Sequence, residues 1–92
     1  MSQFYEGSVS WNVGNILDGD EADQDITVTG AAFGDYVQVS ASLSFLDLTC
    51  TAHVSAANTV TIILANNTGG TVDMLTPTMY VKVEKRLAIV DA

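Results

Sequence analysis

Apolar and small polar residues alternate along most of the chain between Asp25 and Arg86. The apolar positions recur at every second residue in several short runs, namely Ile26, Val28; Val37, Val39, Ala41, Leu43; Leu48, Cys50, Ala52, Val54; Val60, Ile62, Leu64; and Met79, Val81, Val83. Thr, Ser, Gln and Lys occupy most of the positions between them. A period of two is typical of strands that bury one face and leave the other in water. The chain is therefore predicted to be all-β.

Turn residues divide this pattern into six to seven short strands. The clearest are predicted at residues 8–13, 26–29, 35–43, 48–55, 58–65 and 78–85. Ala56 and Ala57 are a connection short enough to make the strands on either side an antiparallel hairpin. Short strands at this spacing predict two packed antiparallel sheets, arranged as a small β-sandwich or as a jelly-roll-like barrel.

The two ends of the chain lie outside the strand pattern and are predicted to be arms. The N-terminal arm, residues 1–7, contains Phe4 and Tyr5, and the C-terminal arm, residues 87–92, contains Leu87, Ile89 and Val90. The β domain between them spans residues 8–86. Because free tails are normally polar, apolar tails indicate arms that dock on a partner.

Size and charge narrow the class of protein further. A domain of 92 residues buries only about 60 to 65 per cent of the surface of its unfolded chain, so additional burial through oligomerisation is expected. Cys50 is the only cysteine and falls on an apolar face, which indicates a small buried residue in preference to a reactive thiol. A net charge of −8 repels phosphate backbones, so nucleic acid is not an expected partner. Neither a signal peptide nor a membrane span is evident, so no membrane partner is expected and the chain is expected in the cytosol unless a larger assembly carries it out.

The segment from Asp18 to Asp25 contains five acidic residues and is predicted to be a solvated loop, since Asp and Gly are depleted in strands. Its carboxylates are the kind of oxygen ligand that Ca²⁺ prefers. The spacing nevertheless differs from that of an EF-hand loop. A solubilising loop is the preferred interpretation and a calcium site is the alternative, so no metal or cofactor is predicted.

Few other residues suggest chemistry. His53 is placed on the polar face of its strand without a recognisable nucleophile or orienting partner, which indicates that the protein is not an enzyme. Ile63 and Tyr80 are large residues that alternation turns away from the core. They are interpreted as a subunit interface, with scattered exposed residues as the alternative.

Three stretches of the chain resemble a small β domain of tailed-phage virion proteins, which occurs in capsid decoration (cement) proteins, head fibres and tail fibres. These are residues 26–40, Ile-Thr-Val-Thr-Gly-Ala-Ala-Phe-Gly-Asp-Tyr-Val-Gln-Val-Ser, together with residues 52–62 and 65–73. The resemblance covers roughly residues 16 to 85, and its most specific parts are the Gly34-Asp35 turn and the hairpin at 55–60. The acidic segment at 18–25 is more charged than this family pattern, and residues 87–92 extend beyond it.

The resemblance implies a non-enzymatic homotrimer on the outer surface of the virion, assembled in the host cytoplasm. Because the chain is short, a decoration protein that bridges major capsid protein subunits and stabilises the head is expected. Expected capsid contacts are Phe4, Tyr5, Phe45, Leu46, Leu87, Ile89 and Val90. The alternative is a receptor- or carbohydrate-binding module of a head or tail fibre, for which Tyr36 and Tyr80 are the candidate aromatic residues.

Overall fold

The computed structural model describes residues 4–86, and all of the regular structure in this range is β. The strands are β1 (Phe4–Ser10), β2 (Asn15–Ile16), β3 (Glu21–Thr27), β4 (Tyr36–Ala41), β5 (Thr49–Ala56), β6 (Thr59–Ala65), β7 (Val72–Asp73) and β8 (Thr78–Glu84). Every strand pair is antiparallel. The predicted all-β fold is confirmed, and so is the hairpin, which joins β5 to β6.

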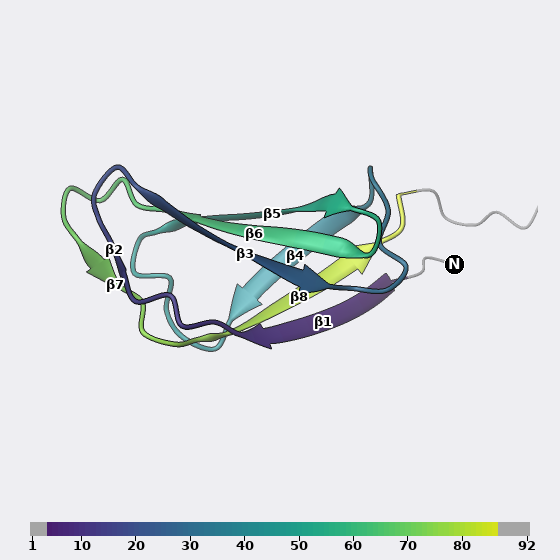
Figure 1. Cartoon of the computed structure of the whole chain (residues 1–92), viewed down its shortest axis with the longest axis horizontal. Coiled ribbons are helices and arrows are strands. Elements are labelled where there is room, and N and C mark those ends of the chain that lie inside the picture. Colours follow the sequence, from purple (N-terminus) through teal and green to yellow (C-terminus); the bar gives the residue numbers. More distant parts are fainter. Residues whose placement is uncertain (1–3, 87–92) are drawn as a thin grey trace, which may run out of the picture.

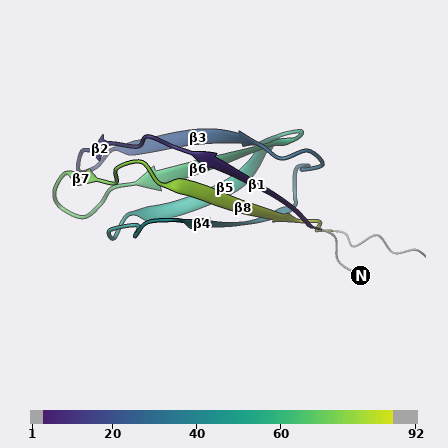
Figure 2. The same cartoon turned by 90° about the horizontal axis from the view of Figure 1, so that it is seen from below.

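Two three-stranded sheets pack face to face as a small β-sandwich (Figure 1). One sheet has the order β1-β8-β4 and the other has the order β3-β6-β5. β4 lies beside β5 and β1 lies beside β3, so the sandwich has a β4–β5 flank and a β1–β3 flank. The two layers are also visible from below in Figure 2. The short strands β2 and β7 form a separate ribbon at one end of this elongated molecule, which measures 52 × 21 × 20 Å.

The core lies between the two central strands. Val60, Ile62 and Leu64 of β6 are fully buried, as are Met79 and Val83 of β8. Full burial of such side chains contributes about 1.5 to 3 kcal/mol each. Alternation along β6 and β8 therefore turns one face of each central strand into the core.

The predicted N-terminal arm is wrong for residues 4–7, which belong to β1. Phe4 pairs with Glu84 of β8, and the ladder continues without interruption to Ser10. The Tyr5 ring packs over Gly30, where a Cβ atom would lie 2.9 Å from it. Gly30 has a φ of +101°, a backbone conformation that glycine adopts at little cost. Tyr5 thus closes one end of the sandwich instead of extending from it.

The acidic segment is also ordered differently from the prediction, because residues 21–25 are part of strand β3. Ala22 and Gln24 are half-buried, whereas Glu21, Asp23 and Asp25 are exposed. β3 lies at the edge of its sheet, where charged side chains prevent pairing with another chain. The carboxylates of Glu21, Asp23 and Asp25 all lie on the solvent-exposed face of β3, so their charge does not prevent this segment from forming a strand.

Candidate binding surfaces

The outer face of the β1-β8-β4 sheet carries three exposed aromatic residues. The strand register aligns Phe4, Glu84 and Tyr36 in one row across the sheet, and it places Ser8, Tyr80 and Ser40 in another. The rings are well exposed, with Phe4 at 52%, Tyr36 at 59% and Tyr80 at 46%. Sequence alternation located Tyr36 and Tyr80 correctly on this face, but Phe4 joins them only because β1 starts early.

Tyr80 stands between two shallow hollows on this face. One hollow lies toward β4 and is lined by Gln38 and Ser40, among others. The other lies toward β1 and is lined by Glu6 and Ser8. Lys82 Nζ lies 4.6 Å from the centroid of the Phe4 ring, a cation–π contact that fixes the ammonium beside the first hollow. Aromatic and hydrogen-bonding groups are therefore combined on one surface.

Ile63, the other predicted interface residue, lies on the opposite face of the molecule. It is half-buried on the outside of the β3-β6-β5 sheet, where Asp23 and Thr51 are its cross-strand neighbours. Tyr80 belongs to the other sheet. One copy therefore cannot present both residues on the same flat surface.

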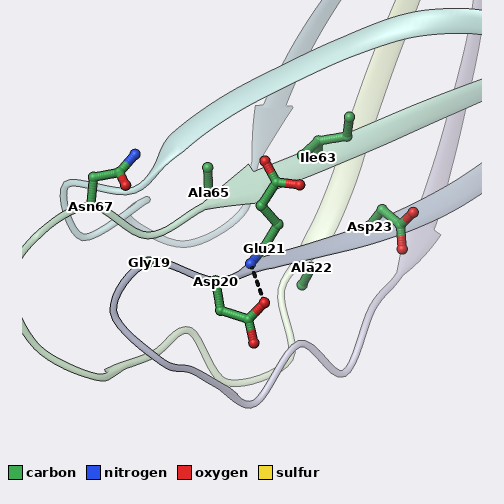
Figure 3. Close-up of a pocket in the computed structure, with 8 residues that line it drawn as sticks. All are labelled: Gly19, Asp20, Glu21, Ala22, Asp23, Ile63, Ala65 and Asn67. Atoms are coloured by element: carbon green, nitrogen blue, oxygen red, sulfur yellow. Dashed lines mark hydrogen bonds between the residues drawn. The ribbon is translucent and has the colours of Figure 1, made fainter.

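The acidic residues line a groove of about 400 Å³ at one end of β3 (Figure 3). Asp20, Glu21 and Asp23 lie along one wall, with Ile63, Ala65 and Asn67 across from them. Figure 3 shows that the Glu21 side chain extends toward Ile63 and that the Asp20 and Asp23 carboxyl groups point elsewhere. The Asp20 carboxylate instead accepts a hydrogen bond from the Glu21 backbone N–H, at 2.8 Å.

This arrangement does not resemble a metal site. Within residues 4–86, no three His, Cys, Asp or Glu side chains converge in a way that could hold a metal ion. Alternate residues of one edge strand are spread along its length, so carboxylates of β3 cannot surround a cation by themselves.

His53 lies in a row of polar residues on the outer face of the β3-β6-β5 sheet. In the register of the β3-β6-β5 sheet, Asp25, Thr61 and His53 form one row. Thr61 Oγ1 lies 2.7 Å from Asp25 Oδ1 and 2.7 Å from Ser55 Oγ. His53 is exposed and makes no side-chain hydrogen bond within the described range. Cys50 is half-buried, and burial raises the pKa of its thiol, which keeps the thiolate scarce at neutral pH.

Four exposed leucines lie at the end of the sandwich formed by β2, β7 and loops 42–48 and 74–77, at the left of Figure 1. We call these residues, Leu17 (61%), Leu43 (42%), Leu46 (46%) and Leu75 (59%), the leucine end. Backbone hydrogen bonds from Val13 and Gly14 to the Leu75 carbonyl, and from Ser42 to the Thr78 carbonyl, hold the loops together.

Only Leu46 of this surface was expected to make contacts outside the domain. Leu43 was assigned to a strand of residues 35–43, but β4 ends at Ala41 and Leu43 is exposed in the loop. The available signal is a pair of adjacent apolar residues beside turn-forming residues, as in Ile16-Leu17-Asp18-Gly19 and Met74-Leu75-Thr76-Pro77. One member of each such pair must point outward, and here Ile16 and Met74 occupy the core.

Two of these leucines have an unfavourable backbone conformation. Leu46 has a φ of 53° and Leu75 has a φ of 63°. The left-handed region costs a residue with a Cβ atom roughly 1 to 2 kcal/mol, and Gly and Asn tolerate it better. Leu46 and Leu75 are thus exposed leucines at positions where neither burial nor backbone preference favours leucine.

The predicted capsid contacts are divided between the two ends of the molecule. Phe4 and Tyr5 lie at the end where β1 begins, and Phe45 and Leu46 lie at the leucine end. Phe45 packs against the core, whereas Leu46 points outward. The predictions for Leu87, Ile89 and Val90 fall outside the described residues.

Comparison of the chain with protein-family models, with curated proteins and with solved structures gave no match. In residues 4–86 there is also no helix of the length and apolar character needed to cross a membrane. The fold and these surfaces are therefore the basis for assigning a function.

Proposed function

We propose that this chain is a non-enzymatic decoration protein of a tailed-phage capsid, which forms a homotrimer on the outer surface of the head and bridges major capsid protein subunits. The observation that carries the proposal is the leucine end. Four exposed leucines lie in the loops at one end of a narrow sandwich, where they are available for apolar contacts. The resemblance of residues 26–40, 52–62 and 65–73 to virion β domains supports the same assignment.

The mechanism is the burial of apolar surface at a repeated contact. Burial of an exposed leucine contributes at most about 1.5 to 3 kcal/mol. A trimer presents three leucine ends at once, so even weak individual contacts combine into stable attachment when the geometry lets all three engage. Contacts to neighbouring capsid subunits then resist their separation under internal pressure.

The decisive experiment measures binding to heads assembled from the major capsid protein encoded in the same genome. The double variant Leu46→Asn/Leu75→Asn should reduce co-sedimentation with these heads strongly while leaving the far-ultraviolet circular dichroism unchanged. Phe33→Asn is the matched control, because Phe33 is 72% exposed near Arg86, away from the leucine end. Undiminished decoration by the double variant would contradict attachment through the leucine end, and failure of the native chain to bind heads would contradict the proposal itself.

A second candidate function is saccharide binding, which the surroundings of Tyr80 favour. A tyrosine ring flanked by Glu6, Gln38 and Lys82 offers a stacking surface together with hydrogen-bonding groups for hydroxyls. The test is titration with cellohexaose, chitohexaose and maltohexaose, followed by NMR. Shifts of Tyr80 and Lys82 signals that disappear in Tyr80→Ala would support this function, and unchanged spectra with all three sugars would exclude it for these classes.

A further inference from the structure

The two flanks of the sandwich differ in charge. The edge strands of the β1–β3 flank carry four carboxylates, from Glu6, Glu21, Asp23 and Asp25. The edge strands of the β4–β5 flank carry no charged residue at all. Asp35, which Lys85 neutralises, precedes β4, and Asp47 precedes β5. Lys82 and Glu84 of β8, which have opposite charges, are the cross-strand neighbours of Gln38 and Tyr36. In a chain with a net charge of −8, this flank is a neutral surface.

The backbone along the β4–β5 flank is also open to pairing. β4 is the last strand of one sheet and β5 is the last strand of the other, and no ladder joins them within residues 4–86. Each edge presents a row of N–H and C=O groups without a strand partner. Soluble proteins block such edges with charges, prolines or bulges. β3 has the charges, whereas β5 is a strand of eight residues whose only irregularity is a bulge near its end, between Val54 and Ala56.

The core is incompletely covered on the same side. Apart from Val54, which is buried, the inward-facing residues of both edge strands are only half-buried, and these are Val37, Val39, Ala41, Cys50 and Ala52. Their counterparts on the central strands β6 and β8 are fully buried. A strand added along this flank would remove these apolar side chains from water and pair the free backbone groups at the same time.

We propose that a second copy of this chain pairs along the β4–β5 flank, with the open β4 edge of one copy against the open β5 edge of the next, a head-to-tail contact that three copies can close into a ring. Another copy is the occupant that the charge distribution favours, because two chains of net charge −8 repel one another at every acidic surface and approach most easily through the neutral one. The contact joins edge to edge, so it does not require either Ile63 or Tyr80. It also leaves the leucine end free for another partner.

The side-chain pattern restricts how the edges can align. Residues that face one another across two paired strands must lie on the same face of the extended sheet. Thr49, Thr51 and His53 face outward on β5, and Cys50 and Ala52 face inward. A register that pairs an outward-facing residue of one edge strand with an inward-facing residue of the other would leave the half-buried core residues exposed, so such registers are excluded.

The experiment uses the purified native chain without heads, so its outcome does not depend on the proposed decoration function. Size-exclusion chromatography with light scattering should give a mass of at least twice the monomer value of 9.7 kDa. The double variant Gln38→Lys/Thr51→Lys places a charge on each open edge, at positions that are exposed in the single chain. It should elute at 9.7 kDa with unchanged circular dichroism.

The matched control is Ser8→Lys/Thr27→Lys, which adds the same two charges at exposed positions of β1 and β3. It should retain the native mass. A native mass of 9.7 kDa at tens of micromolar, or dissociation of the control while the β4–β5 variant remains assembled, would overturn the proposal. The proposal would also be overturned if the native chain is a monomer and the β4–β5 variant no longer binds heads, because the flank would then pair with a strand of the capsid.

Hydrogen exchange of the native chain gives a test that does not depend on the folding of any variant. Raising the protein concentration should slow the exchange of amides in β4 and β5 and leave those in β1 and β3 unchanged. Slowing confined to β1 and β3, or equal slowing of all edges, would contradict pairing along this flank. A chain that assembles in this way but fails to bind heads would refute the decoration function and leave the interface intact.

Discussion

Lys85 Nζ lies 2.7 Å from Asp35 Oδ2, and this ion pair joins the end of β8 to the beginning of β4. The Asp35 side chain is only 6% exposed. Its two oxygens also accept hydrogen bonds from the backbone N–H groups of Ala32 and Arg86, and Lys85 donates a second bond to the Gly30 carbonyl. The pair therefore fixes the turn at residues 30–34 against the last strand.

The first prediction concerns acid stability. Burial alone raises the pKa of Asp35, but the hydrogen bonds from Lys85, Ala32 and Arg86 and the charge of Lys85 outweigh it and lower the pKa below its ordinary value of 3.8. Since the folded-state pKa is the lower one, the carboxylate stabilises the fold above about pH 4, and this contribution is lost as the pH falls through the folded-state value. Asp35→Asn should reduce the free energy of unfolding at pH 7 by about 1 to 2 kcal/mol, with a smaller difference from the native chain at pH 3.

Urea unfolding followed by the fluorescence of buried Trp11 measures this difference at each pH. Asp23→Asn is the control, because it removes the same charge from an exposed position on β3. Equal losses from the two variants, or a loss from Asp35→Asn that is independent of pH, would show that the ion pair does not control acid stability.

The second prediction tests whether Tyr5 is part of the fold. Gly30→Ala would place a Cβ atom 2.9 Å from the Tyr5 ring at a φ of +101°, so the melting temperature should fall by several degrees, equivalent to about 1 to 3 kcal/mol. Gly70→Ala has open space and no positive φ, and it should leave the melting temperature almost unchanged. Similar melting temperatures for both variants would mean that Tyr5 does not pack on Gly30 in solution.

The third prediction concerns the acidic groove. Because the carboxylates of β3 do not converge, treatment with EDTA should not change the melting temperature, and added Ca²⁺ should raise it no more than added Mg²⁺ does. Differential scanning calorimetry provides the measurement. A fall in EDTA that Ca²⁺ alone restores would identify the groove as a calcium site.

The fourth prediction separates stability from attachment at the leucine end. Leu75→Gly relieves the left-handed conformation at an exposed position, so the free energy of unfolding should stay the same or rise by up to about 1 kcal/mol. If the leucine end binds heads, the same variant should bind them less well. A clear loss of stability in urea would instead show that the Leu75 side chain supports the fold.

The alternation of apolar residues predicts the central strands closely, because Val60, Ile62 and Leu64 must all be inward if one of them is. Edge strands were harder to predict. Phe4 and Tyr5 join β1 because β8 offers a free edge as far as Glu84, and nothing near Phe4 in the sequence reveals that partner. Tertiary pairing thus overrides the local impression of an arm.

The acidic segment shows that local residue preferences can also argue against a strand that tertiary pairing forms. Asp and Glu disfavour strands on average, yet at an edge with one wet face their charge is tolerated and protects the sheet. The sequence predicts only Leu46 of the leucine end. Leu17 and Leu75 are the same residue type as the core leucines and differ from them only in the direction of their side chains. Which of two adjacent apolar residues points outward depends on turn geometry that one sequence does not specify.

Phe4 and Glu84 face one another in the β1–β8 ladder, at the end of the sandwich away from the leucine end. Phe4 and Arg86, the two ends of the described range, therefore lie at the same end of the domain. If the leucine end rests on a shell, Phe4 and Arg86 lie on the side of the domain away from that shell. A fluorescent protein, an antigen or a second binding domain fused to either end of the chain would then be displayed on the outside of the shell, one copy for each bound chain, without crossing the attachment surface.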